Sequence, residues 1–205
     1  MRPFTMLSAP ACPLPLSGID TDQLIPARFM KRSRAEGYGD YLLHDLRFDE
    51  TGARRLDFPL NRPGRDGAQV LVARRNFGGG SSREAAVYAL VDYGIRCVIA
   101  PSFADIFASN AVNNGLLPAQ VAEGDGECLI AVLESGLSEM TVDLSTCRIV
   151  AGNLVVPFEV EQVWRTKLLN GWDDIDLTLS QSAEIRAFNL ADAARRPWAS
   201  PRAGE

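Results

Sequence analysis

The chain has 205 residues, of which 46% are hydrophobic and 23% charged, values typical of a folded globular domain. Its net charge of −5 gives nucleic acid no electrostatic attraction, and no apolar run approaches the about 18 residues that span a bilayer. The amino terminus also lacks the apolar stretch of a secretory signal. We therefore expect a cytoplasmic protein that binds neither nucleic acid nor membrane.

Residues 1–19 include prolines at positions 3, 10, 13 and 15, which disfavour a long helix and predict extended segments. The next stretch, Asp20-Thr21-Asp22, offers two carboxylates and a hydroxyl within three residues. In an extended segment Asp20 and Asp22 would point the same way and could line a site. A turn or a helix N-cap is the commoner explanation, and the motif alone does not decide between the two.

Residues 27–34, after this motif, are predicted to form a short helix or a loop. Four basic side chains cluster there, and they either steer an anionic substrate or form a solvated face: Arg28, Lys31, Arg32 and Arg34. Residues 44–68 are polar and contain several glycines and prolines, which predicts a long connection with one short element near residues 56–60. Connections of this length within a domain are often functional.

The most informative stretch is residues 70–85, where a buried strand, a glycine turn and a helix are predicted in succession. Residues 70–73 form a short apolar run, and the glycines at 78–80 suit a backbone with positive φ or one that approaches a ligand closely. Ser81, with Glu84 three residues later, fits a capping box. This pattern places the start of the helix at Ser81.

A glycine turn that leads into a helix can bind an anion, because free N–H groups converge there and the helix dipole adds positive charge. Arg83 adds a cation whose planar fork suits a carboxylate or a phosphate, and the Ser81 and Ser82 hydroxyls lie beside it. For an isolated Ser-x-x-Glu motif, a simple helix cap with a solvated arginine would be the preferred explanation. The glycines in front of this one favour an anionic ligand.

The remaining pattern predicts a mixed α/β fold with a central, partly parallel sheet. Strands and helices alternate over residues 70–121, with Ser102 as a predicted helix cap, and such alternation gives a parallel unit. Antiparallel strands are predicted at 127–133, 140–144, 147–150 and 153–156. We expect one domain over 1–205, with a core at about 4–157, C-terminal helices at about 159–195 and a tail at 196–205.

Several common sites are not supported by these residues. The turn is not a P-loop, and Arg83 stands where the third glycine of a dinucleotide-binding motif is needed. Ser81 does not lie in a G-x-S-x-G elbow, and the single histidine, His44, gives little support to a Ser-His-Asp triad. The cysteines at 12, 97, 128 and 147 include no C-x-x-C pair, so we expect no metal or iron–sulfur cluster bound by this chain.

Four motifs in order carry a resemblance to a known family. They are residues 20–29 (DTDQLIPARF), 76–84 (NFGGGSSRE), 99–107 (IAPSFADIF) and 114–118 (NGLLP). With them the chain resembles the small subunits of 3-isopropylmalate dehydratase, which are swivelling-domain members of the aconitase superfamily. The resemblance extends from about residue 4 to residue 175 and implies a single swivelling β/β/α domain.

The resemblance implies half of a heterodimeric hydro-lyase of leucine biosynthesis, which isomerises 2-isopropylmalate and 3-isopropylmalate by dehydration and rehydration. The partner would be the large subunit, which carries a [4Fe–4S] cluster in this family, and the substrate would be a small dicarboxylate. By the match, Ser81 would be the general base and Arg83 would stabilise its charge. Gly80, Ser82, Thr21 and Asp22 would bind the substrate.

Two positions depart from the family pattern, because Gly79 and Ala85 stand where cysteine and histidine are usual. The loss of that histidine leaves a second substrate open, so the chain could be a paralogous subunit for a methylmalate-type 2-hydroxy diacid. A non-catalytic dicarboxylate-binding module is the third interpretation. Residues 29–41 resemble the loop that sets substrate specificity in the family.

Overall fold

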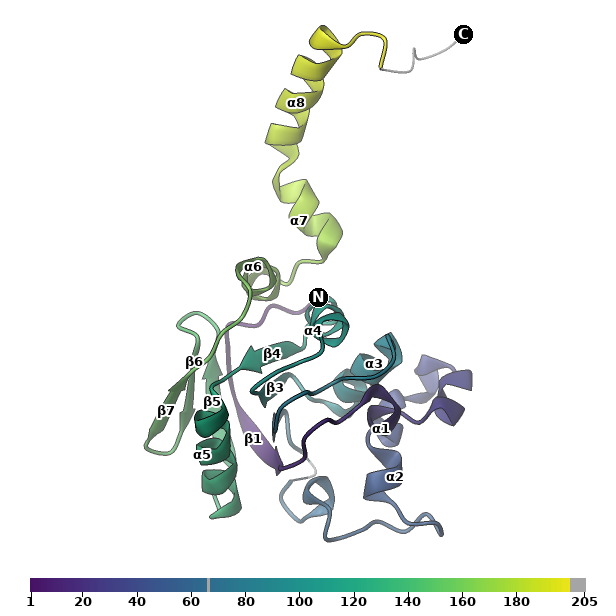
Figure 1. The fold of residues 1–205 in the computed structure, drawn as a ribbon, viewed down its shortest axis with the longest axis vertical. Coiled ribbons are helices and arrows are strands. Elements are labelled where there is room, and N and C mark those ends of the chain that lie inside the picture. Colours follow the sequence, from purple (N-terminus) through teal and green to yellow (C-terminus); the bar gives the residue numbers. More distant parts are fainter. Residues whose placement is uncertain (66, 200–205) are drawn as a thin grey trace.

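A mixed sheet of seven strands forms the centre of the computed structural model, which describes residues 1–65 and 67–199 (Figure 1). The strand order across the sheet is β4-β3-β2-β1-β5-β6-β7. One half is parallel and consists of β1 (Met6–Leu14), β2 (Val70–Ala73), β3 (Cys97–Ala100) and β4 (Leu117–Gln120). The other half is antiparallel and consists of β5 (Glu139–Asp143), β6 (Arg148–Ala151) and β7 (Leu154–Pro157).

Helices connect and flank these strands. The α-helices are α1 (Thr21–Leu24), α2 (His44–Arg47), α3 (Glu84–Tyr93), α4 (Asp105–Asn113), α5 (Glu123–Glu134), α6 (Gln162–Asn170), α7 (Asp174–Ser180) and α8 (Ser182–Arg195). The chain between α1 and β2, called the long connection from here on, includes the connection predicted at 44–68 and several short 3₁₀ helices: η1 (Ala27–Lys31), η2 (Arg34–Glu36), η3 (Tyr38–Tyr41) and η4 (Pro59–Asn61). In the described ranges, no helix is both long and apolar enough to cross a membrane.

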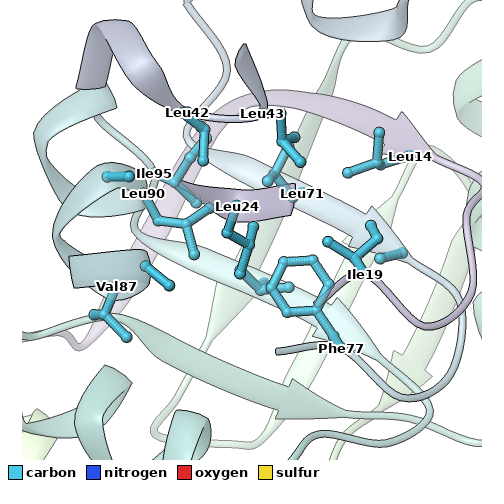
Figure 2. Close-up of a cluster of buried hydrophobic side chains, with 14 of the residues drawn as sticks. Leu14, Ile19, Leu24, Leu42, Leu43, Leu71, Phe77, Val87, Leu90 and Ile95 are labelled. Carbon is cyan, nitrogen blue, oxygen red and sulfur yellow. The ribbon is translucent and has the colours of Figure 1, made fainter. Parts of the chain in front are cut away.

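The sheet separates two apolar clusters, because successive strand residues point to opposite faces. Leu71 of β2 packs on one face with helix residues such as Val87 and Leu90 of α3 (Figure 2). Its neighbour Val72 packs on the other face with residues such as Leu129 of α5. All four residues of β2 are buried, as expected for a central parallel strand covered on both sides.

The predicted parallel unit is confirmed, since β2, α3, β3, α4 and β4 follow one another and the three strands pair in parallel. The predicted strand at 127–133 is wrong, because these residues belong to α5. Its buried positions, Gly126, Leu129, Ile130 and Leu133, have helical spacing and face β1, β2 and β3. The run is short and apolar, and such runs do not distinguish a strand from a buried helix.

Beyond β7 the chain forms the predicted C-terminal helices. α6 packs on α4, whereas α7 and α8 project away from the sheet (Figure 1). We call residues 173–199, which contain α7 and α8, the C-terminal arm. Only residues 196–199 of the predicted tail at 196–205 fall within the described ranges.

The long connection is fixed to the domain where η3 packs on α3. A Cβ at Gly39 would lie 2.6 Å from backbone atoms of Asp92 and Tyr93, which cannot move without shifting the helix. We expect Gly39→Ala to lower the free energy of unfolding by about 1–3 kcal/mol, measured by urea denaturation. Gly124→Ala is the control, because its Cβ would meet nothing within 4 Å on α5. Equal stability of the two variants would contradict this account.

Candidate functional site

Three loops meet at the carboxyl edge of the parallel strands, the place where α/β sheets usually bind ligands. The loop after β1 joins the loop after β2 through a bridge between Asp20 and Gly79. The loop after β2 joins the loop after β3 through a bridge between Phe77 and Phe103. Backbone bonds therefore hold together segments that lie far apart in the sequence.

Gly78 lies at the centre of this junction, and its position requires glycine. Its φ is +78°, and a Cβ there would overlap the ring of Phe107 on α4. Its N–H donates to the carbonyl oxygen of Ile19 at 2.7 Å. The glycine turn thus fits between α4 and the loop after β1, which confirms the expectation of positive φ at this residue.

The Asp20-Thr21-Asp22 segment forms the start of α1, so the N-cap explanation is confirmed for Asp20. Its carboxylate accepts from the Gln23 N–H at 2.7 Å and completes a capping box. Asp22 instead pairs with Arg83, whose side chain is 22% exposed. The alternative of an extended segment is not adopted here, because the chain is helical from Thr21.

Thr21 makes the closest connection between this segment and the glycine turn. Its buried hydroxyl donates to the Ser81 carbonyl oxygen at 3.0 Å and accepts from the Ser81 N–H at 3.1 Å. The Thr21 N–H also donates to the Gly79 carbonyl oxygen at 2.9 Å. These bonds engage the backbone of Ser81, whereas the Ser81 side chain is exposed.

The predicted capping box at Ser81 is wrong, because α3 begins at Glu84 and Arg83 occupies the N-cap without a side-chain bond that caps the helix. The Arg83 N–H donates to the Ser81 carbonyl oxygen at 2.8 Å, which makes a tight turn before the helix. The Glu84 carboxylate accepts from the Asn114 side chain at 3.0 Å instead of returning to Ser81. Ser81 is therefore held by α1, not by the helix that follows it.

The predicted cap at Ser102 is also wrong, because Ala104 precedes α4 and has no side-chain cap bond. The Ser102 hydroxyl accepts from the Asn76 N–H at 2.8 Å. Its carbonyl oxygen accepts from the Phe77 N–H at 3.0 Å. Ser102 therefore braces the loop that leads to the glycine turn.

A cavity of about 200 Å³ opens where these loops and the start of α4 come together. It is lined by Thr21, Gly78, Gly80, Ser81, Ser82, Arg83, Ala104, Asp105, Ile106, Phe107 and Asn110. Of the residues predicted for the site, all but Asp22 line this cavity, and Asp22 is joined to it through Arg83.

α4 contributes a wall of the cavity that is absent from the predicted site. Neither Ile106 nor Asn110 is among the predicted site residues, although this segment follows a parallel strand, as the glycine turn does. That placement at the carboxyl ends of neighbouring strands was the available signal. Gly79 and Ala85, the atypical positions, are not among the described residues that line the cavity, and Ala85 packs against the apolar core.

The electrostatics of this cavity favour an anion. Arg83 at the N-cap of α3 and the first turn of α4 lie in its wall, which brings the positive dipole ends of both helices to the cavity. The Arg83 guanidinium adds a positive charge, and Asp105 is the acidic side chain among the described lining residues. Ser81 and Ser82 are exposed and supply hydroxyls. The arrangement can bind a carboxylate between N–H groups and a fixed cation.

The basic cluster at Arg28 to Arg34 lies outside the cavity lining and is partly paired. Arg28 forms an ion pair with Asp45, and hydrogen bonding to this guanidinium lowers the pKa of the Asp45 carboxyl to about 2. Arg34 pairs with Asp92 at 2.8 Å and lies over the Tyr88 ring. These contacts give both arginines a role in holding the long connection.

The cysteines of this chain do not fit an iron–sulfur cluster. Cys12 and Cys97 are buried in β1 and β3, and burial raises the pKa of the Cys12 thiol to about 12. A thiol with so high a pKa disfavours the thiolate form that binds metal. In residues 1–65 and 67–199, no group of three or more His, Cys, Asp or Glu side chains could hold a metal ion.

Comparisons with known proteins agree on one family. The model of the aconitase C-terminal domain matches residues 1–124. A 3-isopropylmalate dehydratase small subunit from Rhodospirillum centenum is 50% identical over 97% of this chain and 99% of its own length. One from Brucella canis is 45% identical over 97% of this chain and 100% of its own length.

A solved structure is similar as well. The crystal structure of a 3-isopropylmalate dehydratase (leuD) from Methanocaldococcus jannaschii has a TM-score of 0.62 and 26% sequence identity. The similarity covers 90% of this chain and 99% of that chain.

The contact between Thr21 and Ser81 gives a prediction that needs no ligand. We expect Thr21→Val to speed hydrogen exchange of the Ser81 amide about tenfold or more, because the bond from this N–H is lost. Thr21→Ser keeps the hydroxyl and should keep the protection, so it is the matched control. NMR-detected exchange measures both, and equal rates in the two variants would contradict the assigned contact.

Proposed function

The chain belongs to the family of 3-isopropylmalate dehydratase small subunits, and from this premise we propose that it is the small subunit of a hydro-lyase of leucine biosynthesis. Together with a large subunit it interconverts 2-isopropylmalate and 3-isopropylmalate. The observation that carries the proposal is the set of contacts by which two residues of α1 fix the glycine turn and the arginine after it. Thr21 fixes the backbone of Ser81 and Asp22 fixes Arg83, so both side chains reach one anion-binding cavity.

The reaction removes a proton from the carbon next to a carboxylate and expels the neighbouring hydroxyl as water. Readdition of water to the resulting double bond, with the hydroxyl on the other carbon, gives the isomer. In this proposal Ser81 takes the proton as the general base. A neutral serine hydroxyl is a poor base, so this role requires the Ser81 alkoxide, which is accessible near neutral pH only where its negative charge is strongly stabilised.

The chain offers that stabilisation in two ways. Arg83 stands two residues after Ser81 with its guanidinium held by Asp22, and the first turn of α3 adds N–H groups. Ser82 and the backbone of Gly80 hold a substrate carboxylate in the same cavity. Thr21 lines the cavity, but its hydroxyl is already engaged with Ser81, so its contribution is to position the base.

The large subunit supplies the [4Fe–4S] cluster in this proposal, since the cysteines of this chain do not fit one. The free thiols suit a reducing compartment, which supports a cytoplasmic location. Neither of the other interpretations gains support from a specific observation. The atypical Gly79 and Ala85 lie outside the described cavity lining, and the curated relatives at 45–50% identity carry the dehydratase name.

The base assignment is tested by Ser81→Ala in the reconstituted two-subunit enzyme. We expect kcat to fall about 100-fold or more with little change in KM, because only proton transfer is lost. Ser109→Ala is the matched control, because Ser109 is an exposed residue of α4 that does not line the cavity. Assembly with the large subunit is checked by size exclusion, and unchanged kcat in an assembled Ser81→Ala enzyme would refute the role.

A further inference from the structure

The C-terminal arm exposes more large apolar side chains than its length explains. Their exposed fractions lie between 41% and 79%, and they are Ile175, Leu179, Ile185, Phe188, Leu190 and Trp198. Neither α7 nor α8 contains a buried residue among those described. Single exposed apolar residues are ordinary, but such a concentration on one projecting segment indicates a surface that another molecule covers.

The apolar side chains of α8 lie on more than one side of the helix. Ile185 and Phe188 are three residues apart and share a side. Leu190 follows Phe188 by two residues, and at about 100° per residue it points roughly to the opposite side. A single neighbouring helix, such as α8 of a second copy, covers one stripe only. α8 is not apolar all round, because it also carries Glu184, Arg186, Asp192 and Arg195, but a groove in a larger protein can cover the apolar side chains on both sides and leave these charges at its edges.

The root of the arm is fixed to the helix that forms one wall of the cavity. The Lys167 side chain on α6 is 4% exposed, and its ammonium donates to the side chain of Asn113, the last residue of α4, and pairs with Asp174 of α7 at 2.6 Å. The Asp173 carboxylate caps α7 through the N–H groups of Ile175 and Asp176, both at 2.8 Å. Lys167 therefore connects the start of the arm to α4, whose other end lines the cavity.

We propose that the C-terminal arm inserts into an apolar groove of the large subunit and fastens the two subunits together. This inference rests on the proposed function, which requires such a partner, and it assigns the segment that binds it. Isolated helices as short as α7 and α8 are marginal in water, so the arm is stabilised by the partner that encloses it.

The test compares apolar residues on opposite sides of α8 with a matched residue on the domain. Phe188→Ser and Leu190→Ser should each weaken binding of the purified large subunit about tenfold or more, measured by titration calorimetry. Leu56→Ser is the control, because Leu56 is 71% exposed in the long connection and Leu190 is 76% exposed in the arm. Wild-type affinity in both arm variants would overturn the proposal.

Hydrogen exchange gives a second readout that does not depend on activity. Adding the large subunit should slow exchange of the α7 and α8 amides, and no added protection there would overturn the proposal. Sedimentation of the chain alone tests the competing occupant. A dimer that Leu190→Ser dissociates would assign the arm to a second copy instead.

The outcomes also separate this inference from the proposed function. A wild-type complex that assembles but does not isomerise isopropylmalate would refute the proposed function and leave the arm as the binding segment. An active complex whose affinity is unchanged by both arm substitutions would refute the arm and leave the proposed function intact.

Discussion

The paired hydrogen bonds between the Thr21 hydroxyl and the Ser81 backbone are the contact on which the site depends. They join residues 60 positions apart, and they do so inside the domain, where the threonine is 2% exposed. The turn before α3 has no side-chain cap of its own, so the Thr21 hydroxyl is the side-chain group that fixes the backbone of Ser81. The ion pair of Asp22 with Arg83 likewise fixes the guanidinium that lines the cavity.

The two-sided core explains why this junction has a fixed geometry. β1, β2 and β3 lie side by side, and the apolar clusters on their two faces fix the points at which their loops leave the sheet. α5 packs on β1, β2 and β3 and contributes to the second of these clusters. The placement of Ser81 thus depends on packing far from the cavity, through the position of the strand that precedes it.

α4 links the site to the C-terminal arm. Its first turns line the cavity and place Ile106 and Asn110 there, while its last residue, Asn113, bonds to the buried Lys167. A lysine held this far from solvent needs partners for its charge, and Asp174 supplies one at the start of the arm. The fold therefore connects the segment proposed to bind the large subunit to the helix that lines the cavity.

The sequence by itself determined the parallel unit and the antiparallel strands after residue 138, because these follow from local periodicity and composition. It did not determine α5 or the start of α3. The α5 residues form a short apolar run, and whether such a run is a strand or a buried helix is decided by the face it covers. Ser81 matches a helix cap locally, but Thr21 binds its backbone from another part of the chain. Only tertiary structure decides between a local bond and a distant one, because both satisfy the same backbone groups.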